Sequence, residues 1–277
     1  MLNTKQIVVV AAVIVMIGAL LAQPIKGLVD THEQNQEASS DASSVYNLSS
    51  VSEMIKQSLS PALAGEISAV EKQLESAQGE QKLSLLQTLA DKWEDVAKPI
   101  PQGFIYKEIA QAKPSLENWL KSGDAFRKGY TNQQDTALAS ALNQMAIDSY
   151  QHAIQMDGNS LQAKTGLGAA LVTGSNNPMA GIALLREVVE ADPKNLDANK
   201  TLGLFSMQSG QFDRAVDRFL TVIEIQEDAE SYFYLATAYE KIGQKSQAIA
   251  AYNKSKQLAA DPTLSQYIDR QIEELSK

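Results

Sequence analysis

Two consecutive stretches of this chain, residues 196–228 and 229–261, repeat each other at an offset of 33 residues. The repeat is carried by four matched pairs: Leu202 and Leu235, Gly210 and Gly243, Ala215 and Ala248, and Phe219 and Tyr252. A period of this size with helical spacing predicts pairs of helices that stack on their neighbours, because one pair alone cannot bury its apolar face. We therefore expect an all-α array, a fold that commonly serves as a scaffold for other polypeptides.

The pattern extends toward the N-terminus, since Leu167, Gly168 and Ala180 precede Leu202, Gly203 and Ala215 by 35 residues. A further unit carries Trp119, Gly123 and Phe126 on its first helix, and its second helix fits only if roughly eleven extra residues lie within 131–142. Five units are predicted, near residues 83–115, 116–160, 161–195, 196–228 and 229–262. Residues 263–277 are expected to form a capping helix that seals the last apolar face.

These positions resemble those of the tetratricopeptide repeat, most closely at Tyr232, Leu235, Ala236, Tyr239, Gly243, Ala248 and Tyr252. The resemblance covers residues 83 to 277 and implies a right-handed α-solenoid of helix-turn-helix repeats that binds proteins or peptides. Lys164 and Asn199 stand where the first aromatic residue belongs, and Ala229 stands where a closing proline would, so looser joints are expected at these positions. The wider sequence is similar in style to membrane-anchored repeat proteins of bacteria.

The resemblance also implies a binding groove, because such arrays line their concave face mainly with four positions of each first helix. Here these positions give the predicted groove residues Thr165, Ala169, Val172, Lys200, Leu204, Met207, Phe233, Thr237 and Glu240, together with Gln162, Asp197 and Glu230. Leu204, Met207 and Phe233 favour an apolar segment or helix as ligand. Only Lys200 could serve in the basic clamp of chaperone-binding members. Alternatively, some of these side chains pack beneath neighbouring repeats.

An unbroken run of apolar and small residues covers positions 7–22. As a helix this run reaches about 24 Å, between the length of a signal-peptide core and the roughly 30 Å of a bilayer interior. Leu20 is a poor residue before a cut after Ala22, so an uncleaved transmembrane or signal-anchor helix in contact with the lipid bilayer is favoured over a cleaved peptide. Residues 1–29 are assigned to this segment and residues 30–50 to a flexible linker. Residues 51–82 are assigned to N-terminal packing helices, with dimerisation as the alternative.

The distribution of charge favours one membrane orientation and argues against nucleic acid as a partner. Lys5 precedes the apolar run and acidic residues follow it, which predicts a single-pass protein of a cell inner membrane with its bulk on the periplasmic side. The chain carries Lys+Arg 24 against Asp+Glu 33 with no basic run, which argues against nucleic acid. It has no cysteine, which excludes a lipoprotein anchor and a disulfide framework.

No pattern predicts catalysis, a cofactor or a metal site. His152 follows Asp148 by one helical turn, but two ligands without a third favour a surface pair. Three functions remain: a membrane-tethered scaffold that recruits or assembles envelope proteins, an exported soluble adaptor released by signal cleavage, and an N-anchored receptor with its repeats in the cytosol. The first is favoured over the second because the cleavage site is poor, and over the third because the clamp is missing and the charge bias predicts export of the repeats.

Overall fold

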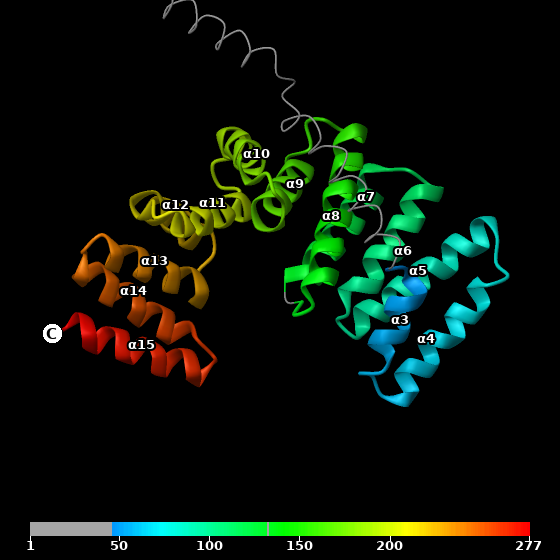
Figure 1. Ribbon diagram of the computed structural model, residues 1–277, viewed down its shortest axis with the longest axis horizontal. Helices are drawn as coiled ribbons and strands as arrows, with labels where there is room; N and C mark the ends of the chain where they lie inside the picture. The colour runs from blue at the N-terminus through cyan, green and yellow to red at the C-terminus, as the bar shows by residue number, and fades with distance from the viewer. Residues whose placement is uncertain (1–45, 132) are drawn as a thin grey trace, which may run out of the picture. The chain divides into compact units, whose positions relative to one another are not determined.

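The computed structural model describes residues 46–131 and 133–277, and the regular elements in these ranges are all helices, with no strand among them. Thirteen helices lie in the described residues (Figure 1): α3 Leu48–Lys56, α4 Pro61–Leu74, α5 Gly79–Asp95, α6 Pro99–Ala112, α7 Leu116–Thr131, α8 Thr136–Met156, α9 Leu161–Gly174, α10 Pro178–Ala191, α11 Leu196–Gln208, α12 Phe212–Ile225, α13 Ala229–Lys241, α14 Lys245–Leu258 and α15 Pro262–Leu275. The prediction of an all-α chain is confirmed for this part of the sequence.

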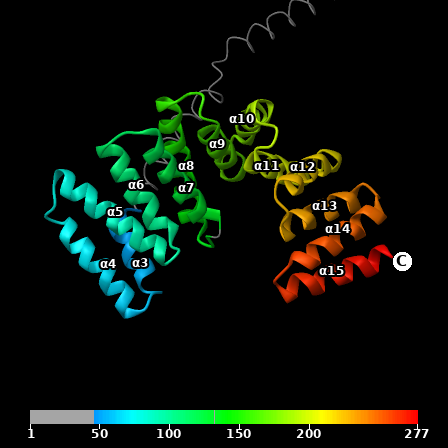
Figure 2. The ribbon, with the colours of Figure 1, turned by 180° about the vertical axis from the view of Figure 1, so that it is seen from behind.

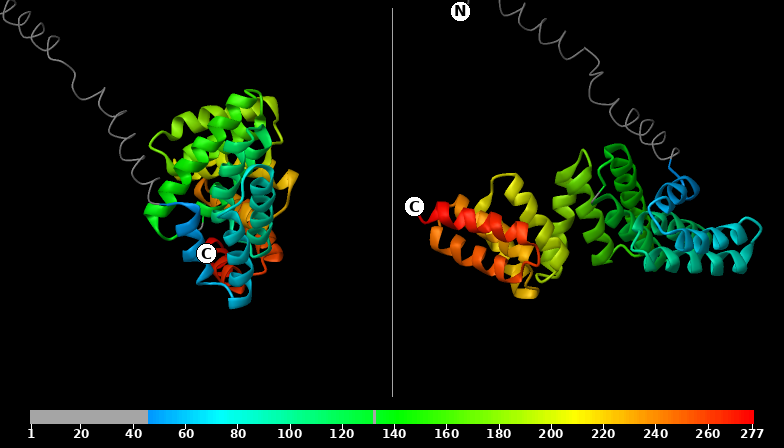
Figure 3. Two further views of the ribbon diagram at one scale, coloured as in Figure 1. Left: turned by 90° about the vertical axis from the view of Figure 1, so that its right-hand side faces the viewer. Right: turned by 90° about the horizontal axis from the view of Figure 1, so that it is seen from below.

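Neighbouring helices pack in pairs, and the pairs follow one another in chain order. The pairs are α5 with α6, α7 with α8, α9 with α10, α11 with α12, and α13 with α14, and α15 lies along α14 (Figures 1 and 2). Figure 3 lets the reader follow this succession from two further sides. Helix α3 begins at Leu48, three residues before the predicted packing helices, and α5 begins at Gly79, four residues before the first predicted unit.

Side-chain caps start the first helix of each later pair at the repeat period. Ser160, Asn195, Asp228 and Asp261 stand 35, 33 and 33 residues apart, immediately before α9, α11, α13 and α15. The side-chain oxygen of each accepts a hydrogen bond from a backbone N–H in the first turn, at 3.2, 3.1, 2.8 and 2.8 Å respectively. Such a bond satisfies a donor that the helix itself leaves unpaired. The sequence period is therefore also a period of helix starts.

Glycines mark where the first helices of the last two pairs end. Gly210 and Gly243 follow α11 and α13 with φ of 73° and 77°, in the left-handed region that costs glycine little. They are one of the four matched pairs of the sequence repeat. The tight turn between α11 and α12 therefore recurs between α13 and α14.

Glycines also let large side chains lie close to a neighbouring helix. The ring of Tyr150, which is fully buried, lies against Gly123 of α7 and Gly166 of α9. A Cβ atom on Gly166 would lie 2.3 Å from two atoms of that ring. Leu185 lies in the same way against Gly168, so the glycines at these positions act through packing rather than through backbone freedom.

The residues that depart from the repeat pattern have identifiable roles. The extra residues of the second unit lengthen a helix: α8 has 21 residues against 14 in α10, and Leu138 and Leu142 of the extension are buried. Asn199 is fully buried, and its Nδ2 donates to the carbonyl oxygens of Pro193 and Asn195 at 2.9 Å each. Lys164 forms an ion pair with Glu187 of α10. Polar contacts thus occupy the two positions where the first aromatic residue of the pattern is replaced.

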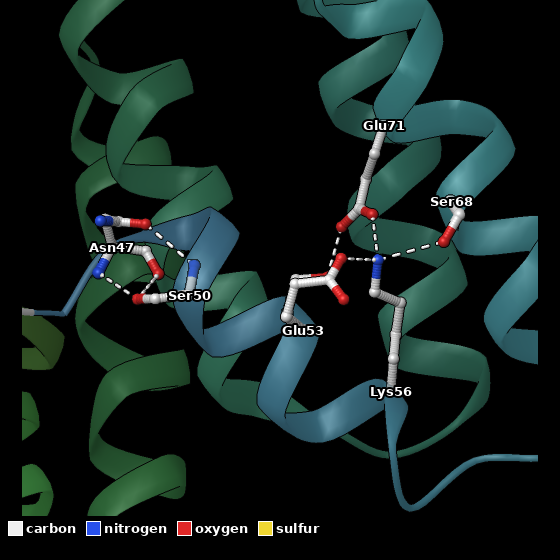
Figure 4. A network of polar contacts seen from close by, with 7 residues as sticks. Asn47, Ser50, Glu53, Lys56, Ser68 and Glu71 are labelled. Carbon is white, nitrogen blue, oxygen red and sulfur yellow. Dashed lines mark hydrogen bonds and ion pairs between the residues drawn. The ribbon is translucent and has the colours of Figure 1, made fainter.

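A charged network joins α3 to α4 (Figure 4). Lys56, whose side chain is 8% exposed, donates to Glu53 Oε1 and Glu71 Oε2 at 2.6 Å each and to Ser68 Oγ at 3.1 Å. Burial lowers the pKa of Lys56, but the hydrogen bonds to Glu53 and Glu71 outweigh it and leave this pKa raised. The short α3 is therefore held by charge-assisted bonds as well as by apolar packing.

The predicted membrane segment at residues 7–22 and most of the predicted linker lie outside the described residues. Among the helices of residues 46–131 and 133–277, none combines the length and the apolar character that crossing a bilayer requires.

Candidate binding groove

A cavity of about 760 Å³ lies among α7, α8, α9, α11 and α13, and we call it the groove cavity. Its lining brings together residues that stand more than 100 positions apart, from Arg127 on α7 to Glu230 on α13. The cavity is formed because the first helices of successive pairs lie beside one another while α8 extends past them along one side. Its volume falls within the range of ligand-binding clefts.

Two ion pairs connect different helices of the cavity lining. Arg127 Nη2 donates to Asp197 Oδ2 of α11 at 3.0 Å, and Lys200 Nζ donates to Glu230 Oε2 of α13 at 2.7 Å. Burial lowers the pKa of Arg127, but the nearby Tyr150 and Asp197 outweigh this and raise it. The lining therefore presents positive and negative groups side by side, held at fixed places by helices of three different pairs.

Two buried polar atoms of the lining have no hydrogen-bond partner within residues 46–131 and 133–277. They are Nε of Arg127, a donor, and Oδ1 of Asn143, an acceptor. Asn143 is 3% exposed, and a Cβ atom on Gly174 would lie 2.6 Å from its Nδ2, so the glycine makes room for the amide. Buried polar atoms nearly always have partners, and an unpaired atom costs about 1–3 kcal/mol. A bound group that supplied one acceptor and one donor would therefore satisfy both atoms.

The rest of the lining supplies hydroxyl groups and apolar surface. Tyr130 Oη and Thr173 Oγ1 lie 2.8 Å apart and link α7 to α9 across the cavity. Ser140 of α8 is exposed, while Leu204 and Ala169 add apolar contact surface. These groups suit a ligand that is itself partly polar and partly apolar.

A second cavity of about 310 Å³ adjoins the first and shares Arg127 and Asp197 with it. It is lined on one side by Asp124, whose carboxylate accepts hydrogen bonds from Tyr150 Oη at 2.6 Å and Gln162 Nε2 at 3.3 Å. Burial and the Asp124 carboxylate raise the pKa of Tyr150, so this hydroxyl stays a donor. Asp124 and Arg127 both line this smaller cavity.

Four of the nine predicted groove residues line these cavities. Ala169, Lys200 and Leu204 line the groove cavity, and Thr165 lines the smaller one. Of the three further positions, Glu230 lines the larger cavity, Gln162 the smaller and Asp197 both. The positions taken from the first helices thus converge around α9 and α11.

The other five predicted residues make contacts within the fold. Val172 packs against Gly181 of α10, where a Cβ atom would lie 2.9 Å from Val172 Cγ2. Met207 and Phe233 pack against the C-terminal core, and the Phe233 ring centroid lies 5.8 Å from those of Tyr252 and Tyr267. The remaining two bond nearby groups: Thr237 Oγ1 donates to the Phe233 carbonyl, and Glu240 accepts from Tyr252 Oη at 3.0 Å. Val172, Met207 and Phe233 therefore fit the alternative interpretation, in which predicted groove residues pack against neighbouring helices.

Sequence reasoning missed Arg127 and Asn143. Continuing the groove positions one unit upstream would have reached Asp124 and Arg127, which stand at the ninth and twelfth positions of the α7 unit. Asn143 has no such signal, because it lies on the second helix of its pair. This helix, α8, is longer than α10, and Asn143 lines the cavity from it.

The Asp148 and His152 pair is separate from these cavities. The His152 ring stacks on Trp119 with centroids 4.3 Å apart, and Asp148 accepts from Gln144 Nε2 at 2.8 Å. Over residues 46–131 and 133–277, no three or more His, Cys, Asp or Glu side chains gather in a way that could hold a metal ion.

Comparison with known proteins identifies one repeat directly. Residues 229–262, which contain α13 and α14, match the family model described as tetratricopeptide repeat. Among curated proteins, the chain is similar to anaphase-promoting complex subunit 3 of Dictyostelium discoideum, with 31% identity over 110 residues, or 39% of this chain and 11% of that protein. The chain thus spans about a tenth of the length of that relative.

Two solved structures share the fold at low identity. One is MamA from residue 41 to its end, from Desulfovibrio magneticus RS-1, with a TM-score of 0.50, 19% identity, and coverage of 66% of this chain and 97% of that chain. The other is a double mutant of MamA RS-1, with a TM-score of 0.50, 20% identity, and coverage of 66% and 96%. The family match thus identifies one tetratricopeptide repeat at residues 229–262, and the two solved structures share the fold of stacked helical pairs.

Proposed function

We propose that this protein is a scaffold that binds an extended segment of another polypeptide in the groove cavity. The observation that carries the proposal is the unpaired donor on Arg127 and the unpaired acceptor on Asn143, both buried in the cavity lining. Each residue of a bound peptide brings one N–H and one C=O, which is the complement of this pair. A segment in extended conformation exposes these groups, whereas a helix uses them internally.

The surrounding side chains support a peptide of mixed character. The ion pairs of Arg127 with Asp197 and of Lys200 with Glu230 offer both signs of charge, and Leu204 offers an apolar contact. An apolar segment or helix was the predicted ligand, but two of the three residues that suggested an apolar ligand, Met207 and Phe233, pack against the core. The lining therefore favours an extended segment over an apolar helix.

A steric block with a matched control tests this proposal. Ser140→Trp places a large side chain at an exposed position of the lining, and Gln151→Trp places the same side chain about 16 Å further along α8, at another exposed position outside the cavity. A library of unstructured 12-residue peptides would be panned on the full-length chain in detergent, and the selected peptides measured by fluorescence anisotropy. We expect Ser140→Trp to weaken binding at least tenfold and Gln151→Trp to leave it unchanged. Equal binding by all three proteins would refute the groove as the site.

We further infer that residues 7–22 tether the scaffold to a membrane, with residues 46–277 on the exported side, where it recruits or assembles envelope proteins. The apolar run, the polar linker that follows it and the charge bias support this arrangement. The test combines the intact mass of the native protein, extraction of membranes with alkaline carbonate, and protease digestion of intact and permeabilised cells. A mass lacking residues 1–22 would favour an exported adaptor. Digestion only after permeabilisation of the inner membrane would favour a cytosol-facing receptor.

A further inference from the structure

A separate cavity of about 570 Å³ lies among α10, α11 and α12, and we call it the arginine cavity. Three of the chain's five arginines line it: Arg186 of α10 and Arg214 and Arg218 of α12. Its apolar lining includes Phe205 and Met179, and Met179 is 65% exposed, the largest exposed fraction among the large hydrophobic residues that are exposed in residues 46–131 and 133–277. A cluster of cations beside apolar surface is unusual in a chain with a net charge of −9.

This cavity and the groove cavity lie on opposite sides of α11. Lys200 and Leu204 line the groove cavity, whereas Leu202 and Phe205 line the arginine cavity. At about 100° per residue, the two sets of α11 residues point roughly 140° apart around the helix axis. A ligand in one cavity therefore leaves the other accessible.

The arginines of this cavity have no carboxylate partner within the described ranges. None of the ion pairs there includes Arg186, Arg214 or Arg218. Arg214 donates to the Gln211 amide oxygen, and Arg218 Nη1 donates to Asn199 Oδ1 at 2.9 Å. Asp217 is the one carboxylate in the lining, so the lining carries a net charge of about +2.

The arginines also repel one another. Burial lowers the pKa of Arg218, Asp217 raises it, and the positive charge of Arg186, the smallest of the three effects, lowers it. Asp217 offsets part of the positive charge, and the lining keeps a net positive charge that a bound anion would reduce.

We propose that the arginine cavity binds an acidic polypeptide segment that carries an apolar side chain next to its carboxylates. The planar guanidinium forks of Arg186 and Arg214 suit carboxylates, because each can donate two parallel hydrogen bonds. The apolar side chain would lie on Phe205 and Met179. A nucleic acid fits less well, because it would bring a long run of phosphates toward an acidic protein, whereas a peptide needs to place only two or three carboxylates in the cavity.

The test uses two defined peptides and a paired charge change. The probes are a labelled acidic peptide, acetyl-EELEELEE-amide, and its counterpart with every Glu replaced by Gln. The variant Arg186→Gln/Arg214→Gln removes two exposed cations of the cavity, and Lys245→Gln/Lys254→Gln removes two exposed cations of α14 that do not line it. All binding is measured by anisotropy on the full-length chain in detergent at one salt concentration.

We expect the acidic peptide to bind the wild-type protein, the arginine variant to bind it at least tenfold more weakly, and the lysine variant to change affinity less than twofold. Four results would overturn the proposal: no measurable binding of the acidic peptide to the wild-type protein, equal binding of the Gln peptide, equal weakening by both variants, or full displacement by inorganic phosphate at millimolar concentration. Loss of binding in Ser140→Trp but not in the arginine variant would place the peptide in the groove cavity instead. Because Ser140→Trp leaves the arginine cavity untouched, this proposal and the proposed groove function can fail independently.

Discussion

Tyr150 is the side chain through which the packing of three successive helices can be tested most sharply. Its ring lies between Gly123 of α7 and Gly166 of α9, and its hydroxyl donates to Asp124 at 2.6 Å. Gly166→Ala would place a Cβ atom 2.3 Å from two ring atoms, far inside van der Waals contact. Because the ring is fully buried and its hydroxyl is held, the clash cannot be relieved by a simple swing outward.

The magnitude follows from two opposing effects. Overpacking a well-filled core costs about 1–3 kcal/mol, and a ring held at both ends belongs at the upper part of that range. Replacing a helical glycine by alanine returns about 1 kcal/mol through helix propensity. We expect a net loss of about 1–2 kcal/mol from the free energy of unfolding, which corresponds to a fall of about 2–8 °C in Tm for a unit of this size.

The assay is thermal and urea unfolding followed by circular dichroism, with Gly65→Ala as the matched control. Gly65 is an exposed residue within α4, and a Cβ atom there would meet nothing within 4 Å, so the same change should raise stability by about 0.5–1 kcal/mol. In the Tyr150→Leu background the clash disappears, and Gly166→Ala should then cost less than about 0.5 kcal/mol. An unchanged or raised Tm for Gly166→Ala in the wild-type background would refute the packing argument.

Three further predictions concern other parts of the fold. Phe233→Ala should lower the free energy of unfolding by about 2–4 kcal/mol, because the ring packs against Tyr267 of α15. Amide hydrogen exchange in α15 should therefore be faster than in the wild type. Exchange in α15 as slow as in the wild type would contradict this packing role and make Phe233 a groove residue. Glu71→Gln should cost about 1–3 kcal/mol and loosen α3, because Lys56 loses a charged partner at 2.6 Å, and unchanged exchange in α3 would contradict this. Burial, and next the Glu240 carboxylate, raises the pKa of Tyr252 to about 12 from 10.0. The stability linked to Tyr252 is therefore complete below pH 10.0 and lost as pH rises through about 12, so alkaline unfolding curves of wild type and Tyr252→Phe should converge in that window.

The repeat period predicted much of the fold, because each matched residue has a local physical task. Gly210 and Gly243 end helices, and Asn195 and Asp228 start them, so their spacing can be read without knowledge of distant contacts. The α8 extension was harder to predict. The extra residues near 131–142 suggested an inserted segment, whereas in the structure residues 136–142 belong to α8 and Leu142 is buried.

The candidate site was predictable only where it follows the repeat. Lys200 and Leu204 line the groove cavity because their positions face the same side in every first helix. Phe233 occupies an equivalent position, yet it packs against Tyr267 because α15 lies beyond it instead of another repeat. Asn143 could not be predicted, since its role depends on how far α8 extends beside α9.

The central claim is that a polypeptide segment lies in the groove cavity beside Arg127 and Asn143. A photo-crosslinking amino acid would replace Ser140 in the full-length protein, expressed in the cells from which the chain comes, and Gln151 would carry the same group as control. After irradiation, the crosslinked peptides would be sequenced by mass spectrometry, and the experiment repeated with Asn143→Leu. The account predicts one recurring segment crosslinked at residue 140, absent at residue 151 and reduced at least tenfold by Asn143→Leu. The same segments at both positions, or an Asn143→Leu protein that crosslinks as well as wild type, would contradict it.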